Sequence, residues 1–182
     1  SALYNGLLRR EEAQPAAAAS YCSFIDESAV YTQSPAFQTD GHYWLSQMPV
    51  LQPMLVDRPL AADTAGLPAA CMGHVSVPVA DYETLKSCAT QRSSTAFNYF
   101  LAAMVVYFSR TANRQTVVLG VPSLNRVGRR YRSTLGMFVG VFPVSVTVTP
   151  GMTVDALLGS IGLIMRGALR HARYPLSEIG RA

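Results

Sequence analysis

The sequence predicts an α/β protein in which a mixed β-sheet is flanked by helices, and two observations support this. Apolar residues alternate with polar ones at Val75–Val79 and at Val144–Val148, and a short apolar run occupies Val117–Leu119. Segments with the helical spacing of apolar residues separate these candidate strands, as in α/β folds. We therefore expect the three strands to lie in one sheet.

The first helices are indicated by their start signals. Ser20 and the Ser34-Pro35 pair are expected to begin two helices, because serine caps helix ends and proline favours the first turn. A later segment, Ser94–Arg110, is apolar on nearly all sides and is expected to be a covered helix. Its Phe100 and Met104 are expected to be buried against the sheet.

The remaining helices follow from capping residues and breakers. A short helix is expected at Asp81–Ala89, and Ser93 or Ser94 is expected to cap the apolar helix that follows it. Thr153 is expected to cap a long amphipathic helix, and Pro175 is expected to end that helix. A further helix is expected to begin at Leu176.

Composition limits the classes of function. The 182 residues are 49% hydrophobic and 14% charged, which is typical of one globular domain or a large lobe with a real core. The net charge of +4 comes from 15 basic minus 11 acidic residues. Because a nucleic-acid binder carries a larger basic stripe, this mild excess argues against nucleic acid as a partner.

The cysteines and the apolar runs bear on the cellular setting. Cys22, Cys71 and Cys88 show no metal-ligand spacing, so we expect reduced thiols in the cytoplasm and no metal site. No secretory signal pattern opens the sequence. The most apolar run, Tyr99–Phe108, is far shorter than the ~20 residues that span a bilayer, so we expect no membrane segment.

The residues of an independent catalytic apparatus are missing from the sequence. His42, His74 and His171 are isolated from any nucleophile pattern, and there is neither a useful carboxylate pair nor a glycine-rich phosphate loop. We therefore predict no catalytic residue in this chain.

An arginine-rich loop between the strands at Val117–Leu119 and Val144–Val148 holds the candidate site residues. Asn125 and Arg126 follow a strand end, where they are expected to face substrate or to pin two lobes together. The turn Gly136-Met137-Phe138 is expected to form a wall of a substrate channel. Its glycine permits close backbone approach, and Met137 and Phe138 supply apolar lining.

Two further groups keep a structural and a functional interpretation open. The exposed arginines of the loop, Arg129, Arg130 and Arg132, are either solvated or placed to meet a phosphate, which the guanidinium fork suits. His171, at the C-terminal end of a helix, either packs there or lines a substrate channel.

Three segments carry a resemblance to a known family. They are Gly120-Val-Pro-x-x-Asn-Arg, then Leu135-Gly-Met-Phe-Val-Gly-Val-Phe-Pro-Val, and His171-Ala-Arg-Tyr-Pro-Leu. In order and spacing they resemble the condensation domains of nonribosomal peptide synthetases. Two departures are visible, because Gly140 stands where asparagine is usual and Leu176-Ser177-Glu178 replaces a Phe-Glu pair.

The resemblance implies a two-lobed domain in which each lobe is similar to chloramphenicol acetyltransferase, with a tunnel between the lobes. Residues 1–19 would be the end of the N-terminal lobe and a linker, and residues 20–182 an incomplete C-terminal lobe. The catalytic motif H-H-x-x-x-D-G of the family does not occur in this sequence. The chain alone is therefore expected to be inactive.

The function implied is amide-bond formation between a carrier-bound acyl or aminoacyl thioester and an aminoacyl acceptor. The chain would bind no cofactor directly and would meet the phosphopantetheine arms of peptidyl or acyl carrier domains. Further implied partners are the N-terminal lobe and an adjacent adenylation domain. Two alternatives stay open: an acyltransferase of the same superfamily acting on an alcohol or amine, and a non-catalytic domain that docks carrier proteins.

Overall fold

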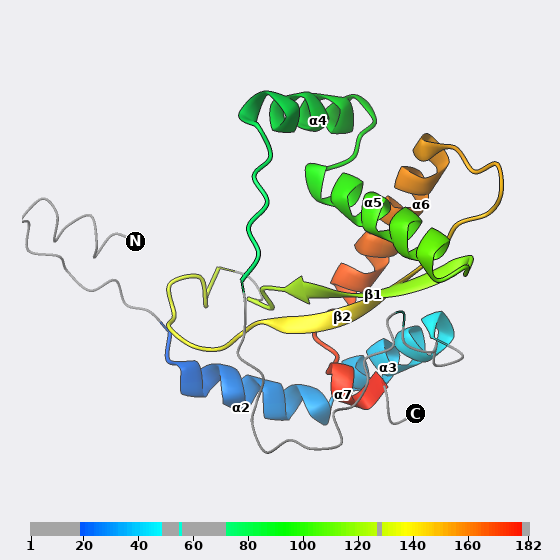
Figure 1. Ribbon diagram of the computed structural model, residues 1–182. Helices are drawn as coiled ribbons and strands as arrows, with labels where there is room; N and C mark the ends of the chain where they lie inside the picture. The colour runs from blue at the N-terminus through cyan, green and yellow to red at the C-terminus, as the bar shows by residue number, and fades with distance from the viewer. Residues whose placement is uncertain (1–18, 49–54, 56–71, 127–128, 180–182) are drawn as a thin grey trace, which may run out of the picture. The chain divides into compact units, whose positions relative to one another are not determined.

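The computed structural model describes residues 19–48, 55, 72–126 and 129–179, and helices and strands share this part of the chain (Figure 1). The α/β class is therefore confirmed. The elements are α2 (Tyr21–Thr32), α3 (Pro35–Gln47), α4 (Val79–Gln91), α5 (Ala96–Thr111), β1 (Thr116–Ser123), β2 (Gly140–Thr147), α6 (Val154–Arg170) and α7 (Leu176–Ile179).

Local capping sets the helix starts. The Ser20 side chain accepts a hydrogen bond from Cys22 N at 3.2 Å, and Ser34 accepts one from Phe37 N at 3.3 Å. Thr153 accepts one from Ala156 N at 3.2 Å. Each satisfies an N–H that the helix leaves without an internal partner, so these three predicted starts are confirmed.

The start of α5 differs from the prediction. Thr95, and neither Ser93 nor Ser94, caps this helix by accepting from Asn98 N at 3.2 Å. Ser93 has φ +52, which is the left-handed conformation in which a chain leaves a helix. It therefore belongs to the turn after α4 and cannot begin the next helix.

β1 and β2 form a two-stranded antiparallel sheet. A mixed sheet was expected, but no parallel pair occurs among the described strands. The hydroxyls of Thr116 and Thr147 lie 3.0 Å apart, and Val148 N donates to Gln115 O at 2.8 Å. The loop after β1 reverses the chain, and a direct reversal gives antiparallel neighbours.

The prediction of a third strand at Val75–Val79 is wrong. Residues 72–78 form no strand, and helix α4 begins at Val79 after Pro78. Val75 is 93% exposed. Pro78 offers no backbone N–H to a sheet, and its fixed φ suits the position just before a helix.

The expected burial of Phe100 and Met104 is also wrong, because they are 44% and 48% exposed. The buried residues of α5 are Leu101, Ala102 and Val105. Since these lie on one stripe of the helix, one face of α5 is covered by the described residues and the opposite face is open.

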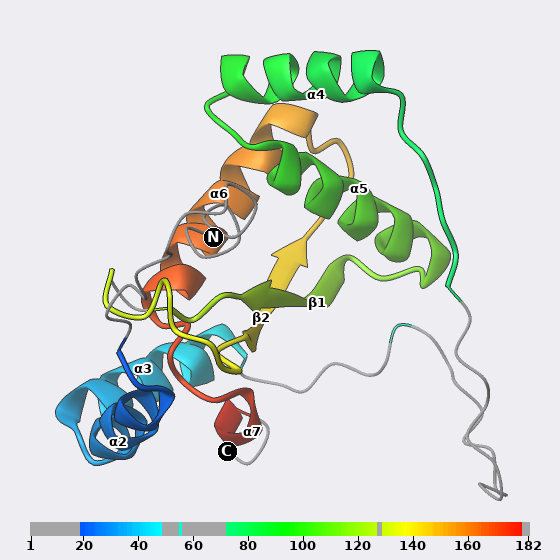
Figure 2. The same cartoon turned by 90° about the vertical axis from the view of Figure 1, so that its left-hand side faces the viewer.

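The chain divides into two compact units. Among the described residues, the first contains 19–48, 120–126, 129–143 and 168–179, and the second contains 55, 72–119 and 144–167. In the first, α3 packs on both α2 and α7; in the second, α4 packs on α5 (Figures 1 and 2). The largest fully buried side chains are Trp44, Tyr131 and Phe142 in the first unit and Ile161 and Val105 in the second. The expected lobe boundary at residue 19 adjoins residues 1–18, which lie outside the described part of the chain, as does Cys71.

Candidate functional site

The loop between β1 and β2 begins with a left-handed residue. Asn125 has φ +46, a conformation that asparagine tolerates better than most residues. Its backbone N–H donates to the Ser123 hydroxyl at 3.3 Å. This sharp change of direction brings Arg126 back over the loop that follows it.

Arg126 holds that loop together. Its Nη1 donates to the carbonyl oxygens of Tyr131 and of Thr134, the latter at 2.8 Å. Its guanidinium carbon lies 4.2 Å from the centre of the Phe138 ring, a cation–π distance. The side chain is therefore directed toward its own loop, whose carbonyls it meets, and its role toward substrate or between lobes stays a prediction.

An aromatic cluster fixes the end of the loop to α2. Phe138 is 3% exposed, with ring centroids 4.6 Å from Phe24 and 5.2 Å from Tyr21. The Tyr21 hydroxyl donates to Met137 O at 2.7 Å. Gly136 has φ +156, and an added Cβ would stand 2.3 Å from the Tyr21 ring, so this close approach needs glycine.

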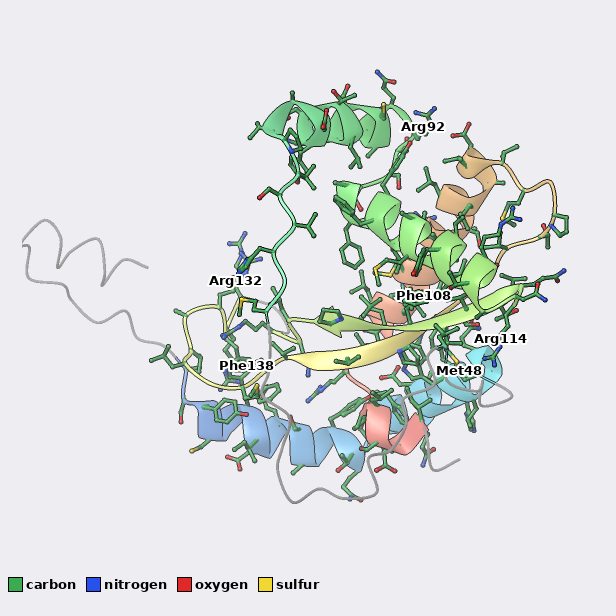
Figure 3. All side chains as sticks on the ribbon, viewed as in Figure 1. Met48, Arg92, Phe108, Arg114, Arg132 and Phe138 are labelled. Carbon is green, nitrogen blue, oxygen red and sulfur yellow. The ribbon has the colours of Figure 1, made fainter. Side chains whose placement is uncertain are left out.

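The three remaining arginines of the loop are exposed. Arg130 forms an ion pair with Glu27 of α2. Arg132 points away from α2, whereas Phe138 lies beside α2 (Figure 3). A phosphate contact by Arg129, Arg130 and Arg132 stays a prediction, and for Arg130 the anion it meets here is Glu27.

A polar network connects α2, α3 and the chain after α6. The Tyr31 hydroxyl donates to Asp40 Oδ2 at 2.5 Å, and His171 Nδ1 lies 2.6 Å from Asp40 Oδ1. We assign Nδ1 as the donor, because a carboxylate accepts. The Asp40 and His171 side chains are 15% and 22% exposed. Burial, followed by the bond to Asp40, raises the pKa of Tyr31.

His171 is held from several sides. Its ring stacks on Tyr43 at 4.0 Å between centroids, and its carbonyl oxygen accepts from Trp44 Nε1 at 2.9 Å. Two positions later, Arg173 Nη2 donates to Glu27 O at 2.7 Å and the guanidinium lies 4.2 Å from the centre of the Tyr31 ring. These contacts support the interpretation that His171 is a packing residue.

Sequence reasoning missed Asp40, Tyr31 and Arg173 as site residues. One signal was present, because Asp40 and Trp44 are four positions apart in α3 and so share a helix face. Both meet residue 171, one through its side chain and the other through its carbonyl.

Two open hollows lie on the first unit. One, of about 740 Å³, is lined by Arg126, Arg170, Arg173 and Asp40 among others. The other, of about 490 Å³, is lined mostly by apolar and aromatic side chains. Four residues line both hollows, which makes them neighbours on one surface: Tyr31, Asn125, Ala172 and Arg173.

Some of the predicted channel residues gather at these hollows. Asn125 lines both, Arg126 lines the larger, and Met137 and Phe138 line the smaller. Gly136 and His171 line neither, because the first packs on Tyr21 and the second faces Asp40 and Tyr43.

Residues 19–48, 55, 72–126 and 129–179 contain no group of three or more His, Cys, Asp and Glu side chains that could hold a metal ion. No helix there has the length and apolar character needed to cross a membrane.

The chain is similar to known proteins over nearly all of its length. Residues 1–182 match the sequence model of the family described as Condensation domain. A dimodular nonribosomal peptide synthase of Bacillus subtilis (strain 168) is 24% identical over 98% of this chain and 7% of its own length. Enterobactin synthase component F of Escherichia coli O157:H7 is 25% identical over 98% of this chain and 14% of its own length.

A solved structure shows the same fold. The first condensation domain of the CDA synthetase superposes with a TM-score of 0.83 at 22% identity, over 99% of this chain and 40% of that one. The chain thus spans less than half of that structure and a small part of each synthetase. Because the family model matches the whole chain and the fold is that of a solved condensation domain, the chain belongs to the condensation domain family.

Proposed function

We propose that this chain is the C-terminal lobe part of a nonribosomal peptide synthetase condensation domain, with residues 20–182 in that lobe. The reaction joins a carrier-bound acyl or aminoacyl thioester to the amine of a carrier-bound aminoacyl acceptor. A C–N bond forms and the thioester C–S bond breaks, so that the amine loses a proton and the donor arm leaves as a thiol.

One observation supports this proposal above the others. Two segments that resemble family motifs, the loop after β1 and the chain from His171, converge on α2 around the adjoining hollows. Between them, they place Asn125, Met137, Phe138 and Arg173 on a single surface. Concave surfaces lined by convergent polar and apolar groups are typical of ligand sites.

The role of the chain in this proposal is to bind and orient, because its sequence contains no H-H-x-x-x-D-G. Arg126 keeps the loop in shape through Tyr131 and Thr134, and Arg173 contributes a fixed positive charge at the junction of the hollows. Holding two reactants in a reactive geometry is itself a large part of catalysis for such a reaction.

The partners follow from the same proposal. Phosphopantetheine arms on peptidyl or acyl carrier domains bring the reactants, and the chain holds no cofactor of its own. The N-terminal lobe completes the tunnel, and an adenylation domain loads the acceptor. The cytoplasmic setting stays a prediction from the cysteine pattern.

The test uses the full-length protein with separately loaded donor and acceptor carriers, and mass spectrometry of the product on the acceptor arm. Formation of an amide supports the proposal, and the isolated 182-residue chain should give none above a blank. Amide or ester formed only from acyl-coenzyme A would support the acyltransferase alternative instead. Carrier binding without product in either assay would support the docking alternative.

A further inference from the structure

We propose that Asp40 is a positioning residue that fixes the place of the Arg173 guanidinium on the surface where the two hollows adjoin. It acts through two connections, the side chain of Tyr31 and the backbone that follows His171. The inference rests on the proposed function, because it gives Asp40 a part in that reaction. Asp40 itself touches no reacting atom.

Arg173 is the residue whose place matters. It is half-buried and is the one charged side chain that lines both hollows. A long side chain that is mobile before a substrate arrives loses entropy when the substrate orders it, and this loss weakens binding. Contacts that hold the guanidinium in one place beforehand therefore favour binding at this surface.

The first connection runs through an aromatic ring. The guanidinium carbon of Arg173 lies 4.2 Å from the centre of the Tyr31 ring, which is a cation–π distance. The hydroxyl of this ring donates to Asp40 Oδ2 at 2.5 Å, and Tyr31 is only 6% exposed. Because the hydroxyl is held at one end, the ring cannot swing away from the guanidinium without breaking its bond to Asp40.

The second connection runs through the backbone. His171 Nδ1 lies 2.6 Å from the other carboxylate oxygen, Asp40 Oδ1, two positions before Arg173. Trp44 Nε1 donates to the carbonyl oxygen of His171 at 2.9 Å, and Trp44 lies one helical turn after Asp40 in α3. The backbone that leads into Arg173 is thus held by one face of α3.

The end of the Arg173 side chain has one further contact, which does not fix its orientation. Its Nη2 donates to the Glu27 carbonyl oxygen at 2.7 Å. A single hydrogen bond lets the planar guanidinium turn about the donor, so the plane of the group is set by the Tyr31 ring beside it. Since Asp40 holds both this ring and the preceding backbone, loss of its carboxylate should release Arg173 from two sides.

A double-mutant cycle in the full-length protein tests this, with the concentration of each loaded carrier varied in turn. Asp40→Ala should raise KM for one carrier about 3- to 30-fold, the range that coupling energies between contacting residues give. In a protein that already carries Arg173→Ala, the same substitution should leave that KM unchanged, because no guanidinium remains to be placed. A purely structural residue would instead raise KM by the same factor in both backgrounds.

Milder variants keep the test valid if Asp40→Ala folds poorly, which thermal melting reveals. Tyr31→Phe keeps the ring beside the guanidinium and removes only the hydroxyl, so it should raise KM less than Asp40→Ala. Asp40→Asn should also give an intermediate KM, because the amide oxygen still accepts from one of the two donors. Asp26→Ala is the matched control, since Asp26 is exposed in α2 and lines neither hollow.

A second measurement needs no turnover. Phenylglyoxal modifies accessible guanidinium groups, and mass spectrometry of the digested protein gives the rate at each arginine. Asp40→Ala should raise the rate at Arg173 several-fold and leave unchanged the rate at Arg166, which is exposed in α6 and lines neither hollow.

Two results would overturn the inference and leave the proposed function standing. One is an equal modification rate at Arg173 in the wild type and in Asp40→Ala, and the other is a KM effect of Asp40→Ala that persists beside Arg173→Ala. If the wild type forms no amide in the carrier assay, the proposed function itself is wrong. The modification rate at Arg173 then decides by itself whether Asp40 places this guanidinium.

Discussion

Asp40 in α3 and His171 just after α6 meet through Oδ1 and Nδ1 at 2.6 Å, although 131 positions separate them in the sequence. Asp40 also accepts from Tyr31, so one carboxylate joins α2, α3 and the segment that leads to α7. This segment carries Ala172 and Arg173, which line both hollows. The shape of the candidate site therefore depends on a residue that does no chemistry of its own in the proposed reaction.

The first prediction concerns this carboxylate. Asp40→Ala leaves the Tyr31 hydroxyl and His171 Nδ1 without their acceptor, so the free energy of unfolding should fall by about 2–4 kcal/mol. Urea unfolding at neutral pH measures it. Asp26→Ala is the matched control, because Asp26 is an exposed residue of α2, and it should stay within about 0.5 kcal/mol of wild type. Similar values for the two variants would show that the network contributes nothing to stability.

The second prediction concerns Gly136. An alanine Cβ at this position would stand 2.3 Å from the Tyr21 ring, on a backbone with φ +156, so Gly136→Ala should destabilise the protein by about 1–3 kcal/mol. Gly159, within α6, has no atom within 4 Å of its added Cβ. Gly159→Ala should therefore be neutral or stabilise by about 0.5–1 kcal/mol. Thermal melting compares the two, and a Gly136→Ala melting temperature at or above wild type would contradict the packing seen here.

The third prediction concerns alkaline pH. Burial and the bond to Asp40 raise the pKa of Tyr31 in the folded protein, whereas the unfolded chain ionises near the ordinary value of about 10. The contribution of Tyr31 is thus fully present below about pH 10 and is lost as pH rises above it. Burial also raises the pKa values of Tyr43, Tyr131 and Tyr174, which adds in the same direction.

Urea unfolding between pH 8 and pH 11 tests this. The wild type should lose stability above pH 10, and Tyr31→Phe should show a shallower loss, by about 1 kcal/mol over the unit above pH 10. Exposed Tyr82 offers the control substitution, because Tyr82→Phe should leave the slope unchanged. Identical slopes for wild type and Tyr31→Phe would mean that Tyr31 ionises equally in both states.

The fourth prediction compares two arginines of one loop. Arg126 donates to two loop carbonyls and stacks on Phe138, and a charge-assisted hydrogen bond is worth about 1.5–3 kcal/mol. In the full-length protein, Arg126→Ala should lower turnover by about one to two orders of magnitude. Arg130→Ala removes an exposed ion pair with Glu27, which is worth about 0–1 kcal/mol, and should do much less.

Steady-state turnover of both arginine variants is measured with thermal melting alongside, which separates a lost contact from misfolding. Near-wild-type rates for both variants would show that these arginines belong to a solvated loop and do not contribute to turnover. A larger loss for Arg130→Ala would instead place the phosphate contact on the exposed part of the loop.

The sequence by itself determined the features that depend on neighbours along the chain. The helix starts at Ser20, Ser34 and Thr153 follow from side chains that bond to N–H groups two or three positions away. The strands around Val118 and Val146 follow from the pattern of apolar residues. The resemblance to condensation domains rests on short ordered motifs and was confirmed by the family match.

Only the tertiary structure decided which distant residues meet. Alternation at Val75 predicted a strand, but a strand needs hydrogen-bonding partners, and the described residues supply none beside Pro78. Apolar character predicted burial of Phe100 and Met104, yet burial depends on which face another element covers. Likewise the Asp40 contact with His171 and the fit of Gly136 against Tyr21 join residues 131 and 115 positions apart, and no local pattern encodes such a distance.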